Sequence, residues 1–284
     1  MKKLLSIVAA TTLATASIAQ AEEYSGEVSI GYQHVFITNE GLDGSDDEFD
    51  ESANGSFVYL GGFKSLDSGA GLYADLTIDH HKSTETDNDD DSEYYSFGLH
   101  YIVNAEEHDP WGVFGFYAVG KNNGDDDDAG PVWGLGAEKR FMNNYYLQGG
   151  YMEYIGDEDN NDDDTMHDMI FARLGGEKAI SRGSLTGSMA VGYGDFDEDS
   201  GADEKDNGTW VQFAFTYEAP INETINWYVG YQADWLEVDE PDSETESGLM
   251  NSVQLGIAIP FGDNKTPFKT PNFRAPLTNA GHLE

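Results

Sequence analysis

The sequence predicts an all-β fold, a transmembrane antiparallel up-and-down β-barrel of about 12 strands. The chain begins with a secretion signal, apolar residues alternate with small or polar ones in segments of about 10 to 14 residues, and the connections between segments alternate between short and long. About 9 to 11 residues of tilted strand cross a bilayer. Beyond the signal no apolar run approaches the ~20 residues of a membrane helix, so a barrel is the spanning structure that remains.

The first 21 residues have the three parts of a secretory signal peptide. Lys2 and Lys3 precede an apolar run, and Ala19-Gln20-Ala21 supplies the small residues of a cleavage site. A membrane anchor is the alternative, but the run is shorter than a span requires. The predicted organisation is a signal peptide at residues 1–21, the barrel at 22–261 and a periplasmic tail at 262–284.

Each strand is predicted from its period-two alternation and from the polar or turn residues that flank it. The twelve predicted strands, in chain order, cover residues 24–37, 55–64, 71–81, 94–103, 111–120, 131–141, 145–155, 167–177, 184–194, 209–218, 224–235 and 249–261. No linker rich in proline or serine divides them, so we expect one domain.

Several strands have one apolar face, which we expect to point outward. In chain order these outward residues are Leu72, Ala74, Leu76 and Ile78, then Trp133, Leu135 and Ala137, then Val211, Phe213, Phe215 and Tyr217, then Ile225, Trp227, Val229, Tyr231 and Trp235. Their neighbours in sequence, including Asp75 and Glu138, would then point inward. Segments 111–120 and 167–177 have apolar residues in both phases, so their faces stay open.

The connections between strands are of two kinds. Short links alternate with long ones, which cover residues 38–54, 82–93, 121–130, 156–168, 194–208 and 236–247 and hold 37 of the 54 acids. Alternate connections of a meander lie at the same end, so one rim is short and the other long and acidic. Barrels of this kind have short turns in the periplasm and longer loops outside, and an even strand number leaves both ends of the barrel chain on the periplasmic side.

The last strand has the clearest pattern. Its apolar phase comprises Leu249, Val253, Leu255, Ile257, Ile259 and Phe261, and its other phase Ser252, Gln254, Gly256 and Ala258. Together with the signal peptide, this strand resembles the closing strand of a Gram-negative outer-membrane β-barrel of the porin-like kind. That family ends its chain at such a strand, whereas here 23 residues follow. The resemblance implies a multi-pass outer-membrane protein whose partners are the barrel-assembly machinery, outer-membrane lipid and lipopolysaccharide.

Aromatic residues gather near strand ends, where they could form interfacial girdles. The residues concerned are Tyr24, Phe63, Tyr94, Trp111, Phe141, Tyr145, Trp210, Trp227, Trp235 and Phe261. The alternative is the general preference of strands for aromatic residues.

Composition excludes several classes of function. The chain has 14 Lys and Arg against 54 Asp and Glu, a net charge of −40, so nucleic acid is not an expected partner. It has no cysteine, which removes disulfides, thiolate metal sites and cysteine nucleophiles. Neither a phosphate-binding glycine loop nor a nucleophile elbow is present, and no cofactor is predicted.

The charged residues in the inward phase are the candidate functional residues. We predict that the pore is lined by Glu27, Lys64, Asp75, Asp79, Glu138, Arg140, Arg173, Glu218 and Asp234, with Glu177 in the same phase. An excess of acid raises the local concentration of cations. The prediction is a passive channel for small hydrophilic solutes that prefers cations.

A closed lumen is the alternative to this channel. Pairs such as Glu138 with Arg140, or Arg173 with Glu177, could neutralise each other and pack the interior. Eight strands fill their interior with side chains and 16 to 18 leave an aqueous channel, so about twelve enclose a narrow passage. The basic tail, with Lys265 and Lys269, could also fold into the lumen as a plug.

The acidic loops suggest a second class of function. Clustered carboxylates suit Ca²⁺, and residues 195–201 approach the spacing of a calcium loop, but an extra serine precedes the glycine and the twelfth position lacks Glu. Whether a metal binds there stays open. A closed barrel with these loops could serve adhesion, cation binding or surface protection, and a solvated, repelling surface is the simplest interpretation.

Catalysis and a soluble location are the remaining alternatives. Asp79-His80-His81 and His167-Asp168 lie near the predicted outer rim and His100 faces inward, but general-base chemistry needs partners within hydrogen-bond reach. Adjacent residues of one strand point to opposite faces. We therefore predict that the protein is not an enzyme. A soluble periplasmic all-β protein is the fourth alternative.

Overall fold

The computed structural model describes the barrel but neither end of the chain. Described residues are 24–40, 49–66, 68–83, 91–105, 109–122, 131–141, 144–154, 165–197, 206–239 and 246–262. The predicted signal peptide and, apart from Gly262, the predicted tail lie outside these ranges. Among the described residues, no helix has the length and apolarity needed to span a membrane.

Twelve strands make up the described part of the chain. Their bounds are β1 (Tyr24–Glu40), β2 (Phe49–Ser65), β3 (Gly71–Ser83), β4 (Asp91–Val103), β5 (Trp111–Asn122), β6 (Val132–Phe141), β7 (Tyr145–Tyr154), β8 (Thr165–Ile180), β9 (Gly183–Asp197), β10 (Asp206–Pro220), β11 (Asn226–Asp239) and β12 (Glu246–Phe261).

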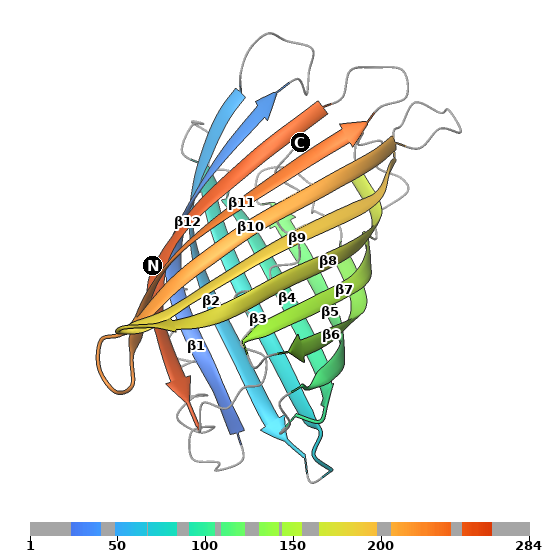
Figure 1. Cartoon of the computed structure of the whole chain (residues 1–284). Helices are drawn as coiled ribbons and strands as arrows, with labels where there is room; N and C mark the ends of the chain where they lie inside the picture. The colour runs from blue at the N-terminus through green and yellow to red at the C-terminus, as the bar shows by residue number, and fades with distance from the viewer. Residues whose placement is uncertain are drawn as a thin grey trace.

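The strands form one closed antiparallel barrel (Figure 1). Each strand pairs with its neighbours in the chain, and β1 closes the barrel on β12 in a ladder that runs from Gly26 opposite Phe261 to Glu40 opposite Ser247. Closure removes the free sheet edges that would otherwise expose unpaired backbone groups to lipid. The predicted fold class, an up-and-down barrel of about 12 strands, is confirmed.

Short turns lie at one end of the barrel. Between β8 and β9 the hairpin has only Ser181 and Arg182, because Ile180 already pairs with Gly183. In the β10–β11 turn, Asn222 Oδ1 accepts hydrogen bonds from the backbone N–H groups of Thr224 and Ile225, at 2.9 Å each. The β1 strand begins and β12 ends at this same end, where Gly26 lies opposite Phe261.

At the end of the barrel opposite the short turns, strand pairing extends further than the alternation of apolar and polar residues predicts. β1 continues to Glu40 and β2 starts at Phe49, and β9 and β10 pair from Asp206 opposite Phe196 onward. Backbone hydrogen bonds continue a ladder whatever the side chains are, whereas alternation requires an apolar face. The predicted loops 38–54 and 194–208 are therefore too long.

The outer face of the barrel is apolar. The predicted outward residues of β3, β6, β10 and β12 do share one face, and many are well exposed, Leu255 at 59% and Phe215 at 53%. Burying such side chains in hydrocarbon stabilises the inserted barrel, since each large apolar side chain contributes about 1.5 to 3 kcal/mol. The exposed apolar surface is therefore the lipid-facing belt.

The aromatic girdle prediction is partly wrong. Tyr24, Trp111 and Tyr145 are exposed on the outer face near the short-turn end. Phe63, Tyr94 and Trp210 instead point inward and are at most 8% exposed. The phase of a residue on its strand, and not its distance from the strand end, decides which face an aromatic side chain occupies.

Candidate functional site

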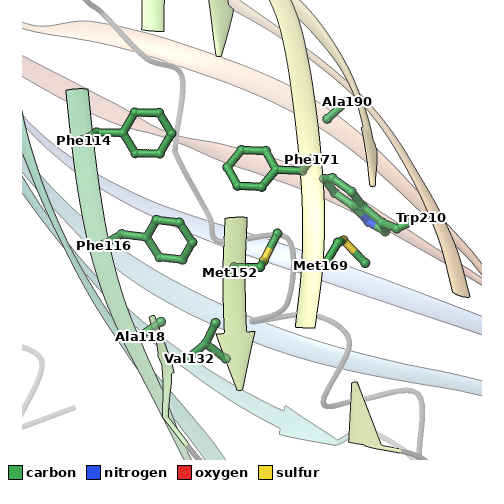
Figure 2. Close-up of a cluster of buried hydrophobic side chains, with 9 residues drawn as sticks. All are labelled: Phe114, Phe116, Ala118, Val132, Met152, Met169, Phe171, Ala190 and Trp210. Atoms are coloured by element: carbon green, nitrogen blue, oxygen red, sulfur yellow. The ribbon is translucent and has the colours of Figure 1, made fainter. Parts of the chain in front are cut away.

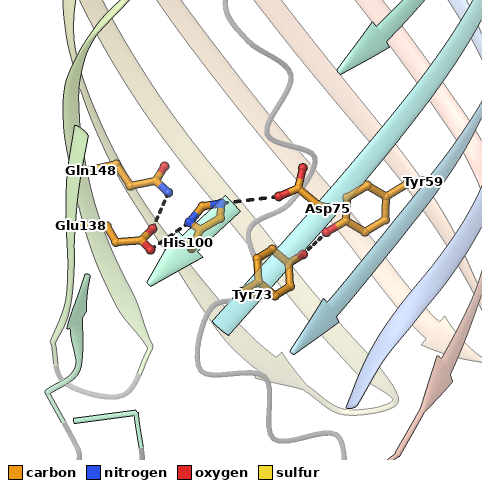
Figure 3. Close-up of polar contacts among 6 residues, drawn as sticks. All are labelled: Tyr59, Tyr73, Asp75, His100, Glu138 and Gln148. Carbon is orange, nitrogen blue, oxygen red and sulfur yellow. Dashed lines mark hydrogen bonds and ion pairs between the residues drawn. The ribbon is translucent and has the colours of Figure 1, made fainter. Parts of the chain in front are cut away.

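On the inner wall a histidine lies between two carboxylates (Figure 3). His100 Nδ1 lies 2.9 Å from Glu138 Oε1, and its Nε2 lies 3.4 Å from Asp75 Oδ2. All three side chains are buried, with His100 only 1% exposed. Both ring nitrogens face carboxylate oxygens, an arrangement that suits the imidazolium form because only that form donates from both nitrogens.

Hydrogen bonds extend this group along the wall. Gln148 Nε2 donates to Glu138 Oε2 at 3.0 Å. The hydroxyls of Tyr59 and Tyr73 are hydrogen-bonded to each other, and the Tyr73 ring packs edge-on to His100 with centroids 5.3 Å apart. These residues come from β2, β3, β4, β6 and β7, so the bonds tie neighbouring strands together on the inside of the barrel.

A second polar group is centred on Asp234 of β11. Its Oδ1 accepts hydrogen bonds from Gln212 Nε2 at 2.7 Å and Trp210 Nε1 at 3.2 Å, and its Oδ2 accepts one from Gln232 at 2.6 Å. Arg173 Nη2 donates to Gln212 Oε1 at 2.9 Å, which brings β8 into the group. We call these two groups together the polar belt.

Two hydrogen bonds of the polar belt join second-neighbour strands, and each passes over a small residue of the strand between them. His100 and Glu138 lie on β4 and β6, and between them β5 presents Gly112, where an added Cβ would lie 3.2 Å from Glu138 Oε1. In the same way, Arg173 reaches Gln212 past Ala190 of β9. A small residue on the middle strand is therefore what lets second-neighbour strands bond directly.

An apolar patch occupies another part of the inner wall (Figure 2). Its buried residues, on β5 to β10, are Phe114, Phe116, Ala118, Val132, Met152, Met169, Phe171, Ala190 and Trp210. Phe114 lies over Gly136, where an added Cβ would be 2.6 Å from the ring, and its centroid is 6.3 Å from that of Phe171. We call this patch the apolar wall.

The two regions meet at two aromatic residues. The His100 ring stacks on Phe114 with centroids 5.5 Å apart, and Trp210 packs in the apolar wall while its Nε1–H donates to Asp234. The inner face is thus amphipathic, with charged and apolar surfaces in direct contact. No prediction anticipated the apolar wall, because segments 111–120 and 167–177 are apolar in both phases.

Eight of the nine predicted pore-lining residues lie in the inward phase of their strands. They are Glu27, Asp75, Asp79, Glu138, Arg140, Arg173, Glu218 and Asp234. Among them Glu27 accepts a hydrogen bond from Ser29 at 2.6 Å and Glu218 one from Asn226 at 2.6 Å. The bonds described above for Glu138 and Arg173 run between strands and not along one strand. The pore-lining role of these residues stays a prediction.

Lys64 is the exception, and its predicted position is wrong. It lies opposite Tyr24 and Leu72 on the outer face, and its Nζ lies 4.9 Å from the centroid of the Tyr24 ring. The interior phase of β2 is the one that carries Phe57, Tyr59 and Phe63, all buried. Because β2 has apolar residues in both phases, alternation assigned Lys64 to the wrong face.

Of the candidate catalytic residues, His100 has the two carboxylate partners described above, whereas His80 and His81 lie on opposite faces of β3. Inside the barrel, His81 Nε2 lies 2.7 Å from Gln33 Nε2, within hydrogen-bond distance. His80 is on the outer face, where its Nδ1 lies 3.9 Å from Glu93 Oε1. The His167 side chain and most of residues 195–201 lie outside the described part. Within it, no group of three or more His, Asp or Glu is placed to hold a metal ion.

The comparisons with known proteins concern the fold. No protein-family model and no curated protein matches the chain. The COG4313 outer membrane channel from Pseudomonas putida F1 is similar in structure with a TM-score of 0.60, at 16% identity, over 85% of this chain and 98% of the channel. The protein has the fold of an outer-membrane β-barrel.

Two further barrels are similar at lower scores. The translocator domain of the autotransporter NalP from Neisseria meningitidis has a TM-score of 0.49 at 13% identity, over 90% of this chain and 95% of that domain. The NanC porin has a TM-score of 0.48 at 12% identity, over 80% and 98%. The closed barrel and its apolar outer belt confirm the predicted location in the outer membrane of a Gram-negative bacterium.

Proposed function

We propose that the protein is an outer-membrane channel for the passive diffusion of small solutes. The observation that carries the proposal is a closed twelve-strand barrel with an apolar outer face and a polar, charged inner face. A lipid-facing barrel gains nothing from buried polar groups unless the interior meets water or a polar solute, because each such group costs free energy to desolvate. The similarity to an outer membrane channel supports the same function.

We further propose a preference for cations, on the basis of the charges on the inner face. In the described strands, acids in the inward phase outnumber Arg140 and Arg173. His100 can offset only one of the two charges of Asp75 and Glu138, and Glu27 and Glu218, which are half buried, add further acid near the short-turn end. Negative charge at a narrow mouth concentrates cations.

A second proposal concerns solutes that are partly apolar. The apolar wall brings three phenylalanines and two methionines into the interior, directly beside the polar belt. Aromatic and methionine side chains contribute dispersion contacts to an apolar ring or chain, while the belt contacts a charged group. We infer that amphipathic cations interact with this channel more strongly than simple ones do.

Single-channel recording tests the channel. Refolded mature protein in a planar bilayer with a KCl gradient should give current steps with a cation-selective reversal potential. The double variant Glu27→Gln/Glu218→Gln should move that potential toward zero, and Lys139→Gln, on the outer face, is the matched control that should leave it unchanged. Silence from folded protein, repeated after removal of residues 263–284, would favour a closed surface barrel with acidic loops instead.

Block of this current tests the amphipathic solute. Phenethylammonium should reduce the current at lower concentration than ethylammonium does, and Phe171→Ala should narrow that difference. Equal block by the two amines in the wild-type channel would reject a role for the apolar wall in solute binding.

A further inference from the structure

The outer face of the barrel has an apolar groove near the short-turn end. Its volume is about 770 Å³, within the range of small-molecule sites. The floor is formed by Gly62 of β2 and Ala74 of β3, which lie directly opposite each other in the ladder. An added Cβ on Gly62 would meet nothing within 4 Å, so the space above the floor is open.

Large side chains wall the groove on both sides. On the β4 side stand Phe97 and Leu99, which lie opposite Leu76 and Ala74. On the β1 side Phe261 lies over Gly26, where an added Cβ would be 2.5 Å from the ring. Phe261 fills the space above Gly26, whereas Gly62 and Ala74 next to it are left uncovered. The result is a depression between aromatic and leucine side chains.

A lysine and a tyrosine stand at one end of the groove. Lys64 and Tyr24 both line it, and Lys64 Nζ lies 3.2 Å from the Tyr24 hydroxyl. Both residues are at the short-turn end, which is the periplasmic side of such barrels. This end therefore lies at the level of the lipid head groups, where lysine and tyrosine side chains are commonly found.

We propose that the groove binds one anionic phospholipid of the periplasmic leaflet. An acyl chain would lie on Gly62 and Ala74 between Phe261 and Leu99, and the phosphate would contact Lys64 and the Tyr24 hydroxyl. The lipid supplies the dispersion contacts that the small floor residues do not make themselves. The head group supplies the negative charge that complements the lysine.

The large negative charge of the chain does not oppose this binding. The described acids Glu93, Asp195 and Glu237 lie at the ends of β4, β9 and β11 away from the short turns, and β3, with 13 residues, is about 40 Å long. That separation is several times the Debye length of about 8 to 10 Å at physiological salt. Nearby groups therefore dominate the field at the groove. Asp75 also borders it but lies in the inward phase, as Glu27 does, whereas Lys64 is a cation in the outward phase.

Native mass spectrometry of the full mature barrel in detergent tests the proposal, with phosphatidylglycerol and phosphatidylcholine of identical acyl chains as probes. Wild-type protein should retain one phosphatidylglycerol about fivefold better than phosphatidylcholine, the effect of about one lysine near the surface. Lys64→Gln should remove this preference. Gly62→Phe should reduce the binding of both lipids, because its ring would occupy the groove.

Matched variants keep the test specific. Lys139→Gln removes an exposed lysine at the same end of β6, and Ala172→Phe adds a ring to the exposed outer face of β8. Neither should alter lipid retention. If Gly62→Phe fails to fold, as judged by heat-modifiable migration on gels, Ala74→Leu fills the same floor.

Three outcomes would overturn the proposal. Equal retention of the two lipids by wild-type protein would remove the role of the phosphate. Unchanged binding in both floor variants would place the lipid elsewhere. A wild-type dimer that a floor variant dissociates would identify the groove as a contact between two copies of the chain.

Discussion

The apolar wall and the polar belt share one barrel interior but are packed in different ways. In the apolar wall a large ring covers a glycine of the adjacent strand, as Phe114 covers Gly136. In the polar belt two long side chains meet above the small residue of a strand between them, as His100 and Glu138 do above Gly112. In both regions the position of a small residue decides which side chains can meet.

This difference in packing implies a difference in energetics. The apolar wall depends on many weak contacts, so its response to truncation should be graded. The polar belt depends on a few charged partners, and removing one leaves another charge buried without it. We therefore expect single substitutions in the belt to cost more than those in the wall, and compensated substitutions in the belt to cost little.

The largest effect is expected for His100→Leu. The substitution leaves the Asp75 and Glu138 carboxylates without their shared partner, which should lower the free energy of unfolding by about 3 to 5 kcal/mol. Urea unfolding of the refolded barrel in lipid vesicles, followed by tryptophan fluorescence, measures this loss. The triple variant His100→Leu/Asp75→Asn/Glu138→Gln should recover most of it. If the triple variant is as unstable as the single one, packing and not charge pairing makes His100 important.

An intermediate effect is expected for Phe171→Ala in the apolar wall. The cavity left beside Phe114 should cost about 3 kcal/mol in the same unfolding measurement. Phe213→Ala on the outer face is the matched control, because lipid chains, which are as apolar as the lost ring, fill the space there. Equal losses at the two sites would show that the wall is no better packed than the lipid-facing surface.

The smallest effect is expected for Tyr59→Phe. It removes one hydroxyl of the bonded pair and leaves that of Tyr73 without this partner, at a cost of about 1 to 2 kcal/mol. The double variant Tyr59→Phe/Tyr73→Phe should lie closer to wild type, because no donor is then left without its bond. A double variant that loses twice as much would mean that the two hydroxyls act independently.

The strands that alternation identified best are those with one apolar and one polar face. β3, β10 and β12 were assigned the correct faces, since lipid on one side and a polar interior on the other impose a strict period of two. β2, β5 and β8 carry apolar residues on both faces. In these strands the sequence pattern does not show which residues face inward. For this reason the predicted face of Lys64 was wrong and the apolar wall was not predicted.

The partners of the inner residues could not be predicted in the same way. Sequence spacing suggested partners two or four residues apart on one strand, such as Glu138 with Arg140. The structure gives Glu138 partners from β4 and β7, 38 and 10 residues away in the chain. Such partners depend on the register between strands, and a shift of one residue would move every side chain to the other face.

The amino-acid sequence was enough to predict an acidic, membrane-spanning barrel of about twelve strands with an apolar outer face, because alternation and loop composition are local properties of a chain. The pairs of residues that meet inside the barrel, and the place of the outer groove, could be seen only in the folded protein. Both depend on small residues such as Gly112 and Gly62 in register with large neighbours on other strands. Register is a property of the closed sheet, which no single strand contains.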